Sequence, residues 1–284
     1  MVYLFMLTAL FLSAPANSAE LYLRGEDQSY GCEQVSEVMD TVLGSDPNKN
    51  ILFFVHGRGH HPEKGIAYLP QFEDTYDLKI IMFHWDSWIN TITRPEKNAV
   101  AAGENLSNCL SQFKKYKEQN PSAFAERKTF YMSHSMGNIV FQSFMENHYK
   151  DKSFPKDLFD TVILSAPDVP TRHHKDWVDR IDFSKKIFIN FNKDDFTLIG
   201  SKLIDYKGLR FFRGHRLGAT PLSKVSKHAN YLDLSNLSFG GHEYFLNKEE
   251  HPTTSIFKDL FNDQDDFSIP YRRHRRRPNI LIFR

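Results

Sequence analysis

The chain has 284 residues, of which 40% are hydrophobic and 25% are charged, and this predicts a globular protein of one large domain or two small ones. The formal net charge is +1, but six arginines and no acidic residue fall in the last 13 residues, so the rest of the chain carries −5. A mildly acidic body with a basic end argues against a dedicated nucleic-acid-binding protein, because such proteins spread positive charge over one face.

The first 19 residues have the pattern of a signal peptide. The apolar run Val2–Phe11 is too short to span a bilayer comfortably, and small residues follow up to Ala19. No Lys or Arg precedes the run, so an uncleaved anchor or a buried first helix is the alternative. We expect cleavage after Ala19 and export to the periplasm or the medium. In an oxidising compartment Cys32 and Cys109 can pair, although two buried free thiols fit the sequence nearly as well.

Apolar runs alternate with stretches of helical spacing through the middle of the chain. Such alternation predicts the α/β class, a mostly parallel sheet with helices on both faces. No repeat or low-complexity linker interrupts it, so we expect one domain over 20–264 and a loose basic tail over 265–284. Docking of the apolar residues 279–283 is the alternative for the end of this tail. The expected strands are 21–23, 51–55, 79–83, 129–132, 161–164, 186–191 and 231–234, the expected helices are 32–43, 98–116 and from 136 onward, and a polar loop is expected up to 77.

One stretch has the sequence of a sharp strand-to-helix turn. Ser133-His134-Ser135-Met136-Gly137 lies between a β-branched, aromatic run and a run with helical spacing. A turn of this kind needs small residues two positions before and after its apex, and it exposes the apex Oγ. Ser135 is the apex, and Ser133 stands where G-x-S-x-G has its first glycine. An ordinary turn that contains serine is the alternative, and partners further along the chain decide between the two.

Polar residues also follow the other expected strands, and parallel α/β sheets form their sites at these strand ends. His56 follows one strand, Asp168 another, Asp194 and Asp195 a later one, and His242 the last. A serine, then an aspartate, then a histidine is the chain order of the α/β-hydrolase triad.

On these motifs the chain resembles the α/β-hydrolases, and it is especially similar to a bacterial α/β-hydrolase family of unknown function. The resemblance implies the α/β-hydrolase fold and a serine hydrolase that acts on carboxylic esters, like an esterase or lipase. One departure is Asp86, where the family often has proline. The motifs that carry the resemblance are residues 53–57, 83–87, 133–138, 164–169, 195–198 with Ser201, and 216–218.

The chemistry assigns a role to each candidate residue. Ser135 is the expected nucleophile, and His242 is its base and later the acid for the leaving group. The resemblance favours Asp195 as the carboxylate that orients His242, with Asp168 as a rival and Asp194 as a weaker one. The N–H groups of Met136 and Arg58 are the expected oxyanion donors, and His56, His134 and Trp85 are expected beside the substrate.

This mechanism requires no cofactor and no metal. His56, His60 and His61 have no obvious carboxylate or cysteine partner, so we expect no metal site there. For Trp85, packing at a strand end is an equal alternative to substrate binding. Residues 60–77 and 198–227 are the expected walls or lid of the pocket.

The expected partner is a small-molecule or lipid ester. A catalytically silent α/β-hydrolase fold that serves as a binding or scaffold protein is the alternative function. The basic tail predicts at most weak contact with an anionic envelope surface, because salt screens exposed charges. Its residues are Arg272, Arg273, Arg275, Arg276 and Arg277.

Overall fold

The computed structural model describes residues 19–46, 48–59, 62–88, 94–207, 214–221, 224–264 and 266–284, without the side chains of residues 62, 64 and 203–207. The expected signal peptide lies, apart from Ala19, outside the described residues, as do His60 and His61. The strands are β1 (Glu20–Tyr22), β2 (Asn50–Val55), β3 (Leu78–His84), β4 (Thr129–His134), β5 (Phe159–Ser165), β6 (Ser184–Phe191), β7 (Asn230–Asp233), β8 (Tyr271–His274) and β9 (Arg277–Phe283). The longer helices are α1 (Val35–Ser45), α2 (Pro62–Tyr76), α3 (Glu96–Gln119), α4 (Gly137–Ser143), α5 (His174–Val178), α6 (Phe196–Lys207) and α7 (Pro252–Phe261).

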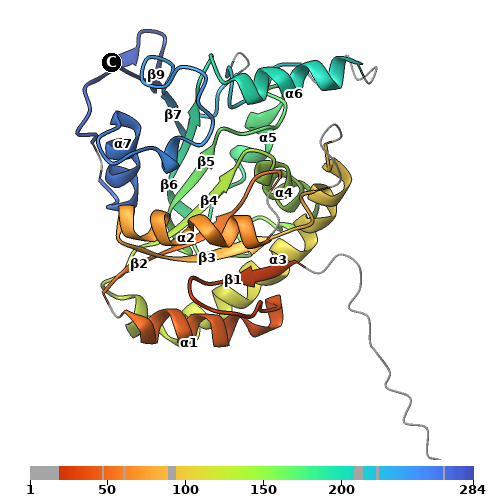
Figure 1. The fold of residues 1–284 in the computed structure, drawn as a ribbon, viewed down its shortest axis with the longest axis vertical. Coiled ribbons are helices and arrows are strands. Elements are labelled where there is room, and N and C mark those ends of the chain that lie inside the picture. The colour runs from red at the N-terminus through yellow and green to blue at the C-terminus, as the bar shows by residue number, and fades with distance from the viewer. Residues whose placement is uncertain are drawn as a thin grey trace, which may run out of the picture.

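In the described part of the chain, these strands form one sheet in the order β1-β3-β2-β4-β5-β6-β7-β9-β8 (Figure 1). Neighbouring strands are parallel from β3 to β9, and only β1 and β8 at the two edges run antiparallel to their partners. The carboxyl ends of β2, β4, β5, β6 and β7 therefore meet at one edge of the sheet, where α/β folds build their sites.

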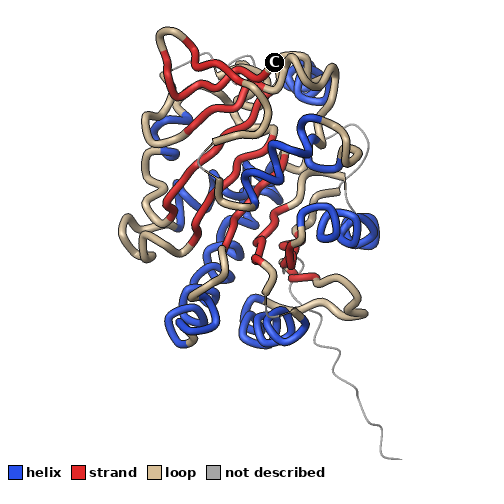
Figure 2. Tube along the Cα trace, turned by 90° about the vertical axis from the view of Figure 1, so that its left-hand side faces the viewer, coloured by secondary structure: helices blue, strands red, loops and turns tan. Residues whose placement is uncertain are grey.

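Helices cover both faces of this sheet (Figure 2). Along β2, Phe53 and Val55 pack into the core beside α1, α3 and α4, while Leu52 and Phe54 pack into the core beside α2 and α7. A strand with both faces covered is apolar without a break, which is why β2 reads as a continuous hydrophobic run.

Helix α2 replaces the polar loop that we expected before residue 77. Leu69, Phe72 and Tyr76 are buried at helical spacing, and the Phe72 ring lies 4.8 Å from that of Phe245. Pro70 lies inside the helix, where proline normally costs stability because its N–H is missing. The buried face compensates for this cost, and the proline and polar residues hid the helical pattern in the sequence.

Residues 277–283 are part of the sheet, so the expected boundary at residue 264 and the loose tail 265–284 are corrected. The alternative, docking of residues 279–283, is what the structure shows. Strand β9 pairs in parallel with β7, with Ile280 opposite Tyr231, and Leu281 and Phe283 are buried. The arginines that suggested a tail lie on β8 and the turn into β9, where four of them are exposed at the sheet edge. Charged side chains are common on edge strands, because they prevent the exposed strand from pairing with another chain.

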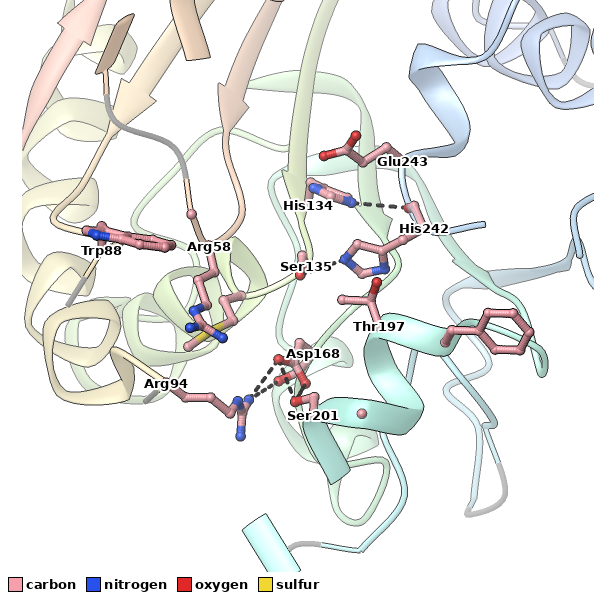
Figure 3. Close-up of a pocket in the computed structure, with 14 residues that line it drawn as sticks. Arg58, Trp88, Arg94, His134, Ser135, Asp168, Thr197, Ser201, His242 and Glu243 are labelled. Atoms are coloured by element: carbon pink, nitrogen blue, oxygen red, sulfur yellow. Dashed lines mark hydrogen bonds and ion pairs between the residues drawn. The ribbon is translucent and has the colours of Figure 1, made fainter. Parts of the chain in front are cut away.

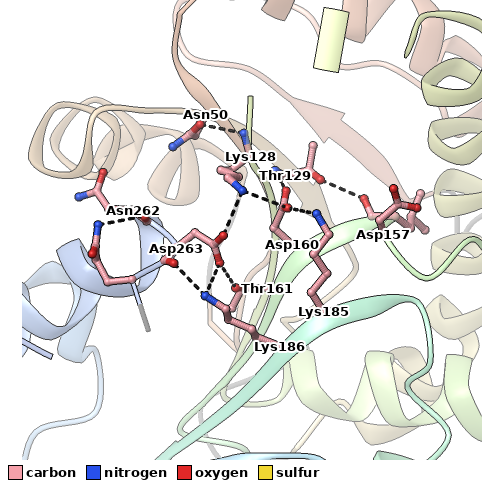
Figure 4. Close-up of polar contacts among 12 residues, drawn as sticks. Asn50, Lys128, Thr129, Asp157, Asp160, Thr161, Lys185, Lys186, Asn262 and Asp263 are labelled. Atoms are coloured by element: carbon pink, nitrogen blue, oxygen red, sulfur yellow. Dashed lines mark hydrogen bonds and ion pairs between the residues drawn. The ribbon is translucent and has the colours of Figure 1, made fainter. Parts of the chain in front are cut away.

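The far end of the sheet from Ser135 is held by charged side chains (Figure 4). Lys185 Nζ lies 2.6 Å from Asp160. The Asp263 carboxylate forms ion pairs with Lys128 at 3.1 Å and with Lys186 at 2.9 Å. Burial would raise the pKa of Asp160, but the hydrogen bond from Lys185 and one from a backbone N–H bring it below its ordinary value. These pairs connect the starts of β4, β5 and β6 to the end of α7.

A disulfide joins Cys32 to Cys109, which settles the alternative left open by the sequence. The bond connects the short helical turn Cys32–Gln34 before α1 to the middle of α3, across 77 positions of the chain. Among the described helices, none is both long and apolar enough to cross a membrane.

Replacing both cysteines with serine is expected to lower the free energy of unfolding by about 4 kcal/mol, because the loop that the bond closes is long. Urea unfolding followed by circular dichroism measures the loss. Wild-type protein in a reducing agent is the matched control and should show the same loss. An unchanged unfolding midpoint in the double variant would contradict the prediction.

Candidate active site

Ser135 stands at the apex of the turn between β4 and α4 with a left-handed backbone, φ 53°. A non-glycine residue in this region is strained and is held there by its surroundings. The backbone passes very close to neighbouring segments: a Cβ at Gly137 would lie 2.6 Å from the His56 carbonyl oxygen, and one at Gly57 would lie 2.8 Å from the Ser135 Cβ. Only glycine fits these two positions, and the close approach places the loop after β2 directly against Ser135.

The structure also explains why serine replaces glycine at position 133. The buried Ser133 hydroxyl donates a hydrogen bond to Asn138 Oδ1 at 2.8 Å. The Asn138 amide in turn donates to the carbonyl oxygens of Ser133, Ser135 and Ser165, at 3.0, 3.1 and 3.2 Å. A single side chain therefore ties the turn to the end of β5, and the Ser133 side chain is part of this network.

Three side chains from distant parts of the chain meet beside this turn, and Figure 3 shows two of them, Ser135 and His242. His242 Nε2 lies 2.9 Å from Ser135 Oγ, and His242 Nδ1 lies 2.7 Å from Asp195 Oδ2. With the His242 ring neutral, Nδ1–H donates to the carboxylate and Nε2 accepts the Ser135 proton. This is the arrangement that activates a serine nucleophile.

The Asp195 carboxylate is fully buried and its direction is fixed from two sides. The Leu198 N–H donates to Oδ1 at 3.0 Å, and the Tyr244 hydroxyl donates to Oδ2 at 2.8 Å. Burial and the nearby Asp195 charge raise the pKa of Tyr244 well above its ordinary value, so the phenol stays protonated and keeps donating.

The rival carboxylate, Asp168, has other partners. Arg94 Nη2 donates to Asp168 Oδ2 at 2.8 Å, Arg216 Nε lies 3.0 Å from Oδ1, and the Ser201 hydroxyl donates to the same carboxylate. Asp194 is partly exposed, and its N–H donates to Asn192 Oδ1. The structure thus brings Asp195, and neither of its rivals, against His242.

The expected oxyanion donors flank Ser135. Met136 directly precedes α4, and the first N–H groups of a helix have no partner within the helix. Arg58 follows Gly57, the residue that the Ser135 side chain nearly touches.

A cavity of about 600 Å³ opens next to Ser135, and His134 and Trp88 line it. His56 and Trp85, which we expected beside the substrate, are not among its lining residues. Both side chains are buried. The Trp85 indole N–H donates to the His56 carbonyl at 2.9 Å, and His56 Nε2 lies 2.8 Å from His84 Nδ1. Their expected role is corrected to packing and hydrogen bonding beside the loop that follows β2.

The two segments expected to wall the cavity, residues 60–77 and 198–227, contribute unequally to its lining. Thr197, Gly200 and Ser201 at the start of α6 line the cavity, whereas no described residue of 62–77 is among its lining. Residues 208–213, in the other part of the expected wall, lie outside the described residues.

Comparison with known families identifies the chain. Residues 33–250 match a family described as an alpha/beta hydrolase of unknown function (DUF900), and this is well over half of the sequence. The chain belongs to this family. The membership confirms the resemblance inferred from the motifs, and together with the sheet it confirms the α/β-hydrolase fold.

Other comparisons of this α/β-hydrolase are more distant. No curated protein matches it. Among solved structures it is similar to esterase PE8, with 12% identity, coverage of 76% of this chain and 93% of that one, and a TM-score of 0.42. A Thermogutta terrifontis esterase, Est2, has 13% identity, coverage of 89% and 92%, and a TM-score of 0.40. Phospholipase PlaB from Legionella pneumophila has 12% identity, coverage of 75% and 60%, and a TM-score of 0.44. Identities and scores this low do not transfer an activity to this hydrolase.

Some residues around the site were not found from the sequence. Tyr244 follows His242 by two positions, and nothing local shows that its hydroxyl reaches Asp195. Arg94 and Arg216 are separated by more than a hundred residues, and although 216–218 is one of the motifs, nothing local shows that both side chains contact Asp168. The role of Asn138 could be predicted from the sequence, because an amide three residues after Ser135 can hydrogen-bond to the carbonyl groups of the turn.

Replacing Tyr244 with phenylalanine is expected to lower kcat for an ester by about fivefold to tenfold, because one hydrogen bond to Asp195 is worth about 1 kcal/mol. Steady-state kinetics on the purified variant measures the change. Tyr76→Phe is the matched control, since its buried hydroxyl donates to the Phe245 carbonyl and does not reach Asp195. An equal loss in both variants would show that the effect is general destabilisation.

Proposed function

We propose that this protein is a serine hydrolase that cleaves carboxylic esters through a covalent acyl-enzyme. The observation that carries the proposal is the continuous hydrogen-bond chain from Ser135 Oγ through His242 to Asp195. The family is one of α/β-hydrolases, and the order of the three residues along the chain is the order typical of that fold.

The mechanism follows from this geometry. Ser135 Oγ attacks the ester carbonyl carbon while its proton passes to His242 Nε2, and Asp195 stabilises the resulting imidazolium. The N–H groups of Met136 and Arg58 donate to the oxyanion. Collapse of the intermediate breaks the bond to the alcohol oxygen, which receives the proton from His242. A water molecule then repeats these steps on the acyl-enzyme and releases the acid.

The cavity supports a small ester as the substrate. Its volume of about 600 Å³ falls in the range of small-molecule sites. Trp88 and Phe196 add apolar surface to its lining, which suits an acyl chain or a lipid tail.

Hydrolysis of p-nitrophenyl esters across a range of acyl lengths tests the proposal, with the matching p-nitroanilides as amide controls. We expect turnover of the esters and much slower cleavage of the amides. Folded protein that cleaves no ester would favour a silent scaffold, and faster amide cleavage would make the enzyme an amidase.

We also propose that the protein is exported and that its mature chain begins near Glu20. The disulfide supports an oxidising compartment, because cytosolic thiols are kept reduced. N-terminal sequencing of protein from its native host tests this proposal. A chain that still begins at Met1 in a cytosolic fraction would reject it. Weak contact of the β8–β9 arginines with an anionic surface stays a prediction.

A further inference from the structure

Exposed large hydrophobic side chains gather at the mouth of the cavity beside Ser135. Among the described residues, five such side chains reach solvent, and four of them lie on or next to the cavity lining. Trp88 and Phe196 line the cavity themselves. Figure 3 places Trp88 and Thr197, the residue after Phe196, on opposite sides of Ser135. The fifth, Val100, lies on α3 and does not line this cavity. Single exposed hydrophobic side chains are ordinary on a protein surface, whereas a group of them marks a site of interaction.

The most exposed of these side chains extend from the two loops that hold the proposed catalytic residues. Phe196 directly follows Asp195 and is 58% exposed, and Phe239 lies three positions before His242 and is 83% exposed. The two rings meet edge to face with their centres 5.3 Å apart. Ile199 is 41% exposed one turn further along α6, on the same side of the helix as Phe196. These three side chains form an apolar surface at the entrance to the cavity, called here the rim surface.

The local structure holds the rim surface in its exposed position. Gly240 has a left-handed backbone, φ 71°, and a Cβ at this residue would lie 2.6 Å from the Phe196 ring. Glycine therefore lets this loop pass directly against α6, which brings Phe239 beside Phe196. Leu198 is buried and anchors the helix from its other side, so Phe196 and Ile199 face outward.

The size and the place of the rim surface favour a lipid surface as its partner. Its two rings expose roughly 300 Å², whereas a stable protein interface buries about 800 Å² on each partner. A protein, or a second copy of this chain, seated on the rim surface would also cover the entrance and keep substrate from Ser135. A lipid surface has neither limitation. A few apolar side chains can enter it without a large complementary area, and its own molecules carry carboxylic esters.

We propose that Phe196, Phe239 and Ile199 insert into a lipid surface, and that Ser135 acts on the ester bonds of lipids held in that surface. This inference rests on the proposed ester hydrolase function and names its substrate class. Insertion removes the rim surface from water, which stabilises the bound state. It also sets the cavity entrance against the surface, so that a lipid leaves the surface only as far as its ester must travel to reach Ser135.

Binding is measured by cosedimentation with vesicles of ether-linked phosphatidylcholine, which contain no ester and therefore separate binding from turnover. We expect the wild type to bind, and the double variant Phe239→Ser, Ile199→Ser to lower the partition coefficient on the order of tenfold or more. Neither residue lines the cavity. Phe239→Trp should bind like the wild type, because tryptophan also favours the lipid–water boundary. Val100→Ser is the matched control and should leave binding unchanged, because Val100 is 48% exposed but lies away from the rim surface.

The second measurement is the ratio of two rates, hydrolysis of a long-chain phosphatidylcholine in vesicles against hydrolysis of dibutyryl phosphatidylcholine dissolved as monomers. This ratio should fall on the order of tenfold in the double variant and stay at the wild-type value in Val100→Ser. Circular dichroism checks that each variant folds.

Wild-type protein that hydrolyses dissolved esters but does not bind vesicles would overturn this inference alone, as would vesicle binding that the double variant leaves unchanged. A dimer in sedimentation velocity that the double variant dissociates would overturn it in favour of a second copy of the chain. Vesicle binding without turnover of any ester would overturn the proposed function, and with it the substrate class.

Discussion

Ser135→Ala is expected to lower kcat for ester hydrolysis by roughly 10³-fold or more, because it removes the atom that forms the acyl-enzyme. Alanine has a Cβ, as serine does, and makes the same backbone hydrogen bonds, in which the Ser135 N–H donates to Ser165 and the Ser135 carbonyl accepts from the Asp168 N–H. The strained turn should therefore persist, and the thermal unfolding temperature should change little.

Ser143→Ala is the matched control for this variant. Ser143 is also buried, lies on α4, and donates to the Val100 carbonyl outside the cavity. Its removal should leave kcat near the wild-type value. Ser135→Ala activity within a few-fold of the wild type, measured on folded protein, would remove Ser135 from the mechanism.

Asp195→Asn is expected to lower kcat on the order of 10⁴-fold, as the corresponding change does in a well-studied triad. The reason is the tautomer of His242: an asparagine amide that donates to Nδ1 leaves the proton on Nε2, which then cannot accept the Ser135 proton. The Leu198 N–H can still donate to the asparagine oxygen, so the local fold should be kept.

Asp168→Asn is the informative comparison, because it removes a carboxylate from the same cavity without touching His242. Arg94 and Arg216 would lose their shared partner, and breaking a buried ion pair costs about 3–5 kcal/mol. We expect a less stable enzyme whose kcat falls far less than that of Asp195→Asn. A nearly normal Asp195→Asn beside an inactive Asp168→Asn would reverse the assignment.

The sequence predicted the strands and the residues at their ends, because buried parallel strands are continuous apolar runs. Ser135 and His242 could be named in this way. Three aspartates also follow strands, and only the resemblance favoured Asp195, since the direction of a side chain depends on partners far along the chain. The Asp168 carboxylate pairs with Arg94 and Arg216 and not with His242, and no local sequence pattern shows this.

The errors in the fold have a related cause. Pro70 and the polar residues of α2 suggested a loop, but contacts of Leu69 and Phe72 with the core determine the helix. The apolar residues of β9 left docking open, but the neighbouring arginines dominate the composition there and favour a loose tail. His56 and Trp85 follow strands as active-site residues do, yet their side chains pack under the loop, where a stacked and hydrogen-bonded arrangement holds them.

The most direct test of the central claim is labelling with a fluorophosphonate probe, because the probe reacts with activated serines and requires no knowledge of the substrate. We expect one label on the folded protein, located at Ser135 by mass spectrometry of the modified peptide. Labelling should be absent in Ser135→Ala and much slower in Asp195→Asn, since His242 then no longer accepts the proton. Folded wild-type protein that remains unlabelled, or that is labelled at another residue, would contradict the proposed mechanism.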